Sequence, residues 1–270
     1  MEEVKKCKYC GKPYKLNENI PSWLPEFARE KIKYIPDCDC LELVAKEEEE
    51  EREKQRQKEC IENRIRKYKS ISVVDSKFKK STFENADNEK YIQLAERYAI
   101  KFLEKNTSLG LLFYGNAGTG KTFASSCIAN FLMEHGKTVL IINLGLYLEK
   151  LKDEYKKDIS TFSEQEFLKA VESVDLLIID DLGTENTTDF TIEKLFNLVD
   201  KRYRSEKPLI INTNLSVNFD DISSCGIARY YSKDNFHRIW DRLKGMCFPV
   251  RVAGTSKRGT IESKFYEFLS

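Results

Sequence analysis

The sequence predicts an α/β protein with a five-stranded parallel sheet between helices, preceded by a small zinc-binding module and a helical linker. Three observations predict it. From about residue 72 onward, short strands that are apolar on nearly every residue alternate with helical patterns, which is typical of a parallel sheet covered on both faces. A glycine-rich loop separates the first of these strands from a helix. Cysteines crowd the first 40 residues, which show little helical or strand periodicity.

Composition divides the chain into three parts: a cysteine-rich module over 1–40, a charged helical linker over 41–71 and an α/β domain over 72–270. The linker consists of strong helix formers, but its glutamate-rich middle lacks apolar heptad positions, which favours a solvated helix over a coiled coil. An apolar stripe appears only at its end. There Ile61, Ile65 and Tyr68 predict that the last turns dock on the following domain.

The cysteines of the first part form two close pairs, Cys7-x₂-Cys10 and Cys38-x-Cys40. A fold that brings the pairs together offers four thiolates to a tetrahedral ion, and Zn²⁺ is the expected one. Disulfides or free thiols are the alternative. We expect the other cysteines to be packing residues or incidental thiols; these are Cys60, Cys127, Cys225 and Cys247. Trp23 is either core of this module or part of a contact surface.

The third part begins with a helix, indicated by apolar residues from Tyr91 to Phe102 at helical spacing. A strand over Gly110–Tyr114 and a helix from Lys121 to about Glu134 follow. The further predicted strands cover 137–143, 174–180, 208–214 and 247–252, and the helices 144–157, 163–173, 191–206 and 235–245.

The loop GNAGTGKT matches the phosphate-binding loop pattern in full, between a strand and a helix. Backbone N–H groups at a helix N-terminus surround a polyphosphate, and side chains on the glycines would block that approach. We expect Lys121 to face the β- and γ-phosphates and the Thr122 hydroxyl to bind Mg²⁺. The alternative is a glycine-rich turn without a ligand. The predicted nucleotide-binding residues are Gly115, Asn116, Ala117, Gly118, Thr119, Gly120, Lys121 and Thr122.

The strand VDLLIIDD ends in two acids. Asp180 is expected to hold Mg²⁺ directly or through water, and Asp181 to orient and polarise the attacking water. Aspartate at the second position is shorter than the more usual glutamate. The alternative is that both aspartates only close a strand.

Two later segments resemble parts of AAA+ ATPases. The strand PLIINTN would run beside the phosphate loop and place Asn214 near the γ-phosphate, which resembles the sensor-one position. The helix HRIWDRLKG resembles the arginine-finger segment, where an arginine reaches the nucleotide of a neighbouring subunit. Its Arg238 and Arg242 lie one turn apart on one face, and Arg242 is the predicted finger. Salt bridges on a surface helix are the alternative.

From Thr82 to Arg258 the chain resembles the DnaC-type bacterial helicase loaders and the related IstB-type transposition ATPases, through TFEN, FYGNAGTGKT, LLIIDDLG, IINTNL, RIWDRL and GTSKR. The resemblance implies ATP as ligand, loading of a replicative DNA helicase onto single-stranded DNA, and self-association through the ATP site. It also implies that Arg258 approaches the phosphates, and that an N-terminal zinc module contacts the helicase.

By this resemblance, the segment LYLEKLKDEYKK corresponds to the place where loaders of this branch contact single-stranded DNA. Its lysines supply positive charge and its tyrosines supply stacking faces. An ordinary amphipathic helix is the alternative. The residues concerned are Tyr147, Lys150, Lys152, Tyr155, Lys156 and Lys157.

Charge and hydropathy bear on two further classes of function, nucleic-acid binding and membrane insertion. The net charge of +1 gives no global attraction to nucleic acid, so DNA contacts must come from local patches. The longest mainly apolar run, Thr138–Leu148, is too short to span a membrane, and the first residues lack a signal-peptide core, so we expect a cytoplasmic protein without membrane contact. Two other functions stay open: a transposition helper of the IstB type, and a nucleotide-switched adaptor with little turnover, suggested by aspartate at 181.

Overall fold

The contacts within the computed structural model divide the chain into a first unit, residues 1–60, and a second unit, residues 61–270. The structure describes residues 5–72, 80–154, 163–231, 236–257, 265, 268 and 269. The division falls inside the long helix α2 (Cys40–Ile71). The three-part division drawn from composition stays a prediction.

The first unit has little core. Its strands β1 (Tyr14–Leu16) and β2 (Tyr34–Pro36) pair antiparallel, and α1 (Glu26–Lys31) lies between them in sequence. Among its described residues Cys7 is the one buried hydrophobic side chain. Trp23 is 79% exposed, so it belongs to the surface of this unit rather than to a core. A unit with so little buried apolar area needs another source of stability.

Helix α2 changes character along its length. Through the glutamate-rich stretch its described side chains are exposed, as predicted, with surface ion pairs such as Arg52 to Glu48. Near its end Tyr68 is buried in the core of the second unit, and its hydroxyl lies 2.9 Å from Oγ of Ser173. The expectation that the last turns of this helix dock on the part of the chain that follows is confirmed at this tyrosine.

The second unit contains five parallel strands in the order β4-β5-β6-β3-β7. Nearly every residue of the three central strands is buried, which explains their continuous apolar sequences. The predicted fold is therefore confirmed. The strands are β3 (Gly110–Tyr114), β4 (Val139–Asn143), β5 (Leu176–Leu182), β6 (Leu209–Thr213) and β7 (Cys247–Arg251).

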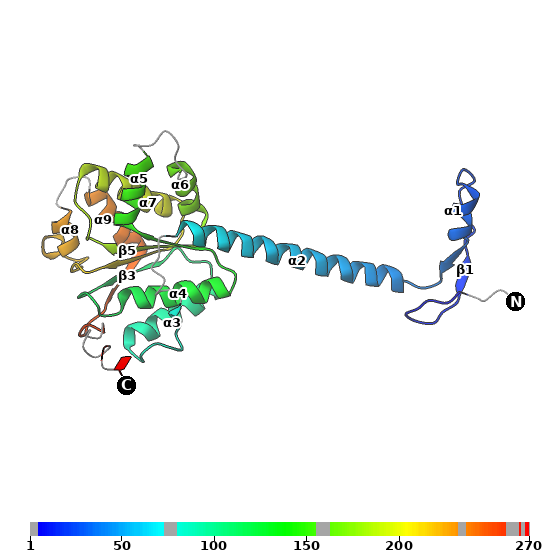
Figure 1. Ribbon diagram of the computed structural model, residues 1–270, viewed down its shortest axis with the longest axis horizontal. Helices are drawn as coiled ribbons and strands as arrows, with labels where there is room; N and C mark the ends of the chain where they lie inside the picture. Colours follow the sequence, from blue (N-terminus) through cyan, green and yellow to red (C-terminus); the bar gives the residue numbers. More distant parts are fainter. Residues whose placement is uncertain are drawn as a thin grey trace. The chain divides into compact units, whose positions relative to one another are not determined.

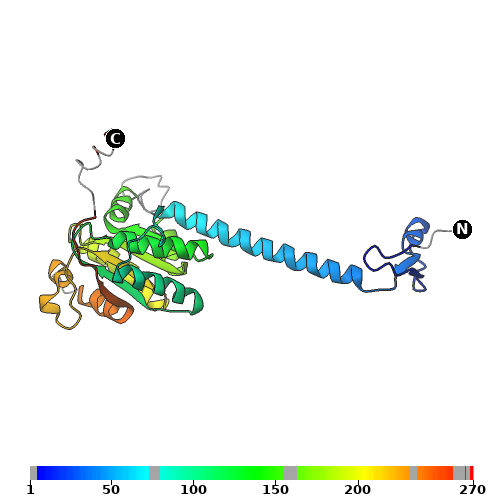
Figure 2. The ribbon, with the colours of Figure 1, turned by 90° about the horizontal axis from the view of Figure 1, so that it is seen from below.

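Helices cover both faces of this sheet (Figure 1). On one face, α3 (Lys90–Glu104) packs against α4 (Lys121–Glu134); Figure 2 shows these two helices in front of the sheet. The other face carries the remaining helices, which share a larger apolar cluster. They are α5 (Leu144–Glu154), α6 (Glu164–Ser173), α7 (Asp189–Arg204), the short α8 (Gly226–Tyr230) and α9 (Phe236–Met246). A 3₁₀ turn, η2 (Ile222–Ser224), precedes α8.

Helix α7 is anchored by a fully buried arginine. The Arg202 guanidinium donates to four backbone carbonyls, those of Val171, Val174, Asp175 and Pro208, at 2.7–3.1 Å. These carbonyls belong to the ends of the segments that enter β5 and β6. Arg202 therefore supplies hydrogen-bond donors to backbone carbonyls at the end of α6 and before β5 and β6.

Candidate functional site

The glycine-rich loop connects β3 to α4, as the sequence predicts. Gly120 has φ 107° and directly precedes α4, a conformation that a residue with a Cβ adopts only under strain. A Cβ on Gly115 would lie 2.1 Å from the carbonyl oxygen of Val252, so the backbone approach at that end also requires glycine. The loop thus presents its N–H groups at a helix N-terminus, which is an anion-binding geometry.

Hydrogen bonds from side chains and from the backbone hold this loop in place. Lys121 is buried, and its Nζ lies 2.8 and 2.7 Å from the carbonyl oxygens of Gly115 and Asn116. The Tyr91 hydroxyl donates to the Thr119 carbonyl at 3.1 Å, and the backbone N–H of Lys257 donates to that of Gly118 at 2.9 Å. Asn116 and Ala117 lie exposed at the tip of the loop.

Thr122 and Asp180 meet directly, although they are 58 residues apart in sequence. The Thr122 hydroxyl donates to Oδ1 of Asp180 at 3.0 Å. A hydroxyl and a carboxylate brought together at the end of a phosphate loop are the oxygen donors that Mg²⁺ takes in such sites. The residues present therefore fit a magnesium ion.

Asp180 is mostly buried, and this burial raises the pKa of its carboxyl to about 6, with the nearby Asp181 adding to the effect. Hydrogen bonds from Asn212 and Thr122 act in the opposite direction. A divalent cation bound here would offset the negative charge of this buried carboxylate.

Asn212 is a site residue that the sequence analysis missed. Its Nδ2 donates to Oδ1 of Asp180 and to Oγ of Ser125, both at 2.7 Å. The sequence carried a signal for this residue, because an amide inside a mostly apolar buried strand must find polar partners. The predicted Asn214 follows β6 directly and is exposed, and its sensor role stays a prediction.

Asp181 has φ 54°, an uncommon backbone conformation for a residue other than glycine. The pairing between β5 and β6 is irregular at the same place, between Ile179 and Leu182. The charge of the Asp181 carboxylate lies close enough to raise the pKa of Asp180. The two aspartates therefore share the carboxyl end of β5, and their separate roles stay predictions.

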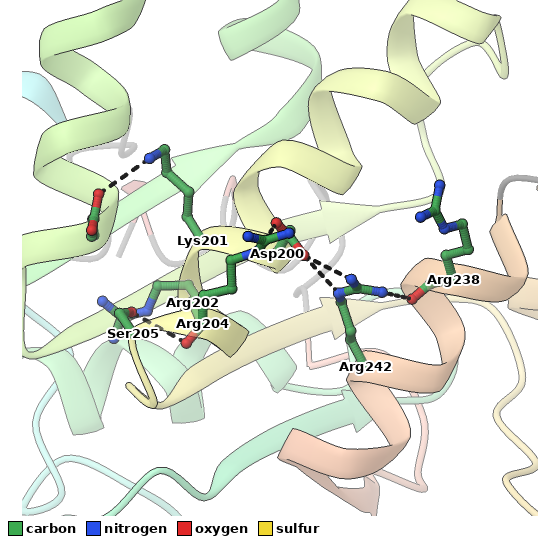
Figure 3. Close-up of polar contacts among 8 residues, drawn as sticks. Asp200, Lys201, Arg202, Arg204, Ser205, Arg238 and Arg242 are labelled. Carbon is green, nitrogen blue, oxygen red and sulfur yellow. Dashed lines mark hydrogen bonds and ion pairs between the residues drawn. The ribbon is translucent and has the colours of Figure 1, made fainter.

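The two arginines of α9 both contact Phe196 of α7, with guanidinium carbons 5.4 Å (Arg238) and 4.9 Å (Arg242) from the ring centroid. Arg242 also forms an ion pair with Asp200, at 2.8 Å from Nη2 to Oδ1 (Figure 3). Arg238 extends away from Asp200 in the same view. Arg242 thus makes the salt bridge that was the alternative to its finger role, and the finger role itself remains a prediction.

The residues predicted to contact single-stranded DNA differ from one another in burial. Tyr147 is 1% exposed and stacks on Phe167 at 4.7 Å between ring centroids, so it belongs to the core and has no face for a DNA base. The prediction of a stacking role for Tyr147 is therefore wrong. Lys150 and Lys152 are exposed on α5. Four further predictions concern residues outside the described part of the chain: Tyr155, Lys156, Lys157 and Arg258.

The predicted zinc ligands come together in the first unit, in agreement with the pairing inferred from spacing. The Sγ atoms of Cys7, Cys10, Cys38 and Cys40 all lie within 4.8 Å of one another. Hydrogen bonds from the backbone N–H groups of Cys10 and Tyr9 lower the pKa of Cys7 to about 7. The neighbouring sulfurs of Cys10 and Cys38 raise the pKa of Cys40 to about 12.

Four thiolates so close together would repel one another, so all four can ionise only with a cation among them. Zn²⁺ supplies that charge and takes four thiolates tetrahedrally, so the cluster fits this ion. The ion would also stabilise a unit in which Cys7 is the one buried hydrophobic residue described. Cys127, Cys225 and Cys247 are buried and act as packing residues, as expected.

Comparison with known proteins gives a family and a set of relatives. The IstB-like ATP binding protein family matches residues 15–264, a range that leaves out Cys7 and Cys10. The replicative helicase loader DnaC of Buchnera aphidicola from Schizaphis graminum is 31% identical over 138 residues, 51% of this chain and 55% of the relative. The replicative helicase loader DnaI of Bacillus subtilis is 26% identical over 159 residues, 57% of this chain and 49% of the relative.

The chain therefore spans about half the length of the curated relatives it matches. Among solved structures, a crystal structure of DnaI superposes with a TM-score of 0.56 at 22% identity, over 69% of this chain and 95% of that one. This likeness shows a shared fold. Among the described helices, none combines the length and apolar character that a membrane crossing requires.

Proposed function

Because this chain belongs to the IstB-like ATP-binding protein family, we propose that it is an ATPase of DNA replication that loads a replicative ring helicase onto single-stranded DNA. The contact between Thr122 and Asp180 beside the buried Lys121 carries the proposal. It joins the end of the phosphate loop to the acidic strand, which is the arrangement required to hold a triphosphate with its metal ion. The names of the relatives supply the loader role.

In the proposed reaction Lys121 would face the β- and γ-phosphates, and Thr122 and Asp180 would hold Mg²⁺, whose charge would offset that of the phosphates. Asp181 orients and polarises the attacking water, with Asn214 near the γ-phosphate. Arg242 of a second copy would complete the site by stabilising charge on the transferred phosphoryl group. The active form is then an assembly of copies joined through their ATP sites.

The first unit is the proposed helicase-binding part. It exposes large apolar side chains, among them Trp23 at 79% and Phe27 at 70%, which is an unusual surface unless a partner covers it. Zinc would fix the fold that displays them. Lys150 and Lys152 of α5 remain the described residues proposed to approach single-stranded DNA.

The adaptor alternative has one specific observation in its favour, the short aspartate at position 181. An adaptor would bind ATP and change its partner affinity without appreciable turnover. Steady-state ATP turnover with and without single-stranded DNA separates the two functions. Turnover supports the loader, whereas ATP-dependent partner binding without turnover supports the adaptor.

The test of the loader function is co-purification with the replicative helicase of the same genome, in Mg²⁺–ATP and without nucleotide. We expect a complex with the wild-type chain and none when Cys7 and Cys10 are both replaced by serine. Cys60→Ser is the matched control, because Cys60 is exposed and lies outside the cysteine cluster. Absence of any complex with the wild-type chain would contradict the loader function.

A further inference from the structure

Near the end of β5, just before the turn that follows this strand, Asp181 has a backbone conformation that is strained for a residue other than glycine. Such a conformation persists only where surrounding contacts fix it. One contact is local: the Thr184 hydroxyl donates to the carbonyl oxygen of Asp181 at 2.9 Å. Thr184 is exposed, so this hydrogen bond alone does not fix the turn.

Glu185 supplies the other constraint. Its Oε2 accepts hydrogen bonds from the backbone N–H groups of Gly183 and Thr184, both at 3.1 Å. The residue is 7% exposed, and burial raises the pKa of its carboxyl. A buried carboxylate that accepts two N–H groups of one turn determines the path of that turn.

Two tyrosines at the end of α8 fix Glu185 in turn. The Tyr231 hydroxyl donates to Oε1 of Glu185, and the Tyr230 hydroxyl donates to the Glu185 carbonyl oxygen. Tyr231 is fully buried and stacks on Phe236, the first residue of α9, at 4.7 Å between ring centroids. The Glu185 side chain is therefore anchored to a packed aromatic group and not to another loop.

We propose that Glu185, anchored by Tyr230 and Tyr231, is a positioning residue that holds Asp181 in the backbone conformation needed to orient the attacking water. This inference rests on the proposed ATPase function. Glu185 is five residues beyond Asp180 and has no described contact with the phosphate loop, so it acts through the turn and not on the nucleotide. Loss of the anchor is expected to affect the chemical step more than ATP binding.

The experiment measures kcat and the ATP dissociation constant in the full chain for Tyr231→Phe, Thr184→Val, Glu185→Ala and Glu185→Gln. We expect Tyr231→Phe and Thr184→Val to lower kcat by about 3- to 10-fold, the equivalent of one hydrogen bond. Glu185→Ala removes three hydrogen bonds and should lower kcat further. The dissociation constant for ATP should change less than about 2-fold in all three variants. Glu185→Gln keeps an oxygen for the two N–H groups and a polar group for Tyr231, and should retain wild-type kcat.

Tyr98→Phe is the matched control. Like Tyr231→Phe, it removes a tyrosine hydroxyl that donates a hydrogen bond. The acceptor is here the backbone carbonyl of Leu109, at 2.8 Å, at the opposite end of β3 from the phosphate loop. Its kcat should equal that of the wild type. If Tyr231→Phe also leaves kcat unchanged, or lowers ATP affinity in parallel, Glu185 has only a structural role and the inference is wrong.

Hydrogen exchange of the Gly183 and Thr184 amides separates failure of this inference from failure of the proposed function. These amides should exchange about 3- to 10-fold faster in Tyr231→Phe than in the wild type, whether or not the chain hydrolyses ATP. A wild-type chain without turnover overturns the ATPase proposal. Unchanged exchange in Tyr231→Phe overturns the positioning role.

Discussion

Arg242 and Asp200 of the same chain form an ion pair in which Nε and Nη2 of the arginine lie 2.9 and 2.8 Å from one carboxylate oxygen. The pair joins α9 to α7, and Arg204 occupies the other oxygen of Asp200 at 2.7 Å. Both partners of the central pair are largely buried, with side-chain exposures of 18% and 14%. A finger placed on Arg242 is therefore held in a defined position by its own chain.

Arg242→Ala is expected to leave ATP binding intact and to lower ATP turnover by about 1,000-fold, the range measured for arginine fingers. Asp200→Asn is the matched control, because it weakens the same ion pair while keeping the arginine. Its turnover should fall less than that of Arg242→Ala. Steady-state phosphate release measures both, and full activity of Arg242→Ala would contradict the interface model.

Lys121→Ala is expected to weaken binding of ATP by at least about 100-fold, because charge-assisted hydrogen bonds to phosphate are lost. Isothermal calorimetry with a non-hydrolysable ATP analogue and Mg²⁺ measures the effect. Lys101→Ala serves as control, since that lysine pairs with Glu104 on the exposed surface of α3. Equal affinity of the two variants would exclude the loop as the nucleotide site.

Purified chain is expected to contain one zinc ion, measured by atomic emission, and Cys7→Ser to lose most of it. Removal of the ion should unfold the first unit selectively, because little apolar area is buried there. Faster hydrogen exchange of the amides of the first unit would report this change, and Cys60→Ser should behave as the wild type. Full zinc content after replacement of Cys7 and Cys10 together would place the metal elsewhere.

The raised pKa of Glu185 predicts a pH dependence of stability. Burial makes the folded chain bind this proton more tightly than the unfolded chain does. The contribution of Glu185 is thus fully present below its ordinary value of 4.5 and is lost as pH rises through the raised pKa. Urea unfolding of the wild type and Glu185→Gln, in steps of pH upward from 4.5, should show the wild type losing stability relative to the variant.

Contributions from other titrating groups cancel in the difference between these two proteins. A difference that stays constant over the whole pH range would show that Glu185 keeps the same pKa in the folded and unfolded chain.

Contiguous patterns predicted the elements well. The strand Gly110–Tyr114 and the helix Lys121–Glu134 have the bounds that the pattern indicates, because period and glycine punctuation are local properties. Tyr147 shows the limit of that reasoning. An aromatic residue among lysines fits a nucleic-acid surface and an amphipathic helix equally well, and its contact with Phe167 on another helix decides between them.

The sequence by itself determined the order of strands and helices along the chain, the position of the phosphate loop and the set of four clustered cysteines. Each of these features lies in one segment or in two close pairs of residues. Only the tertiary structure decided which distant groups meet. Asn212 reaches Asp180 because β6 lies beside β5, and Glu185 is anchored because α8 ends beside the turn. The physical reason is that the neighbours of a buried polar group depend on the order of strands within the sheet and on helix packing. No local sequence pattern records either of these.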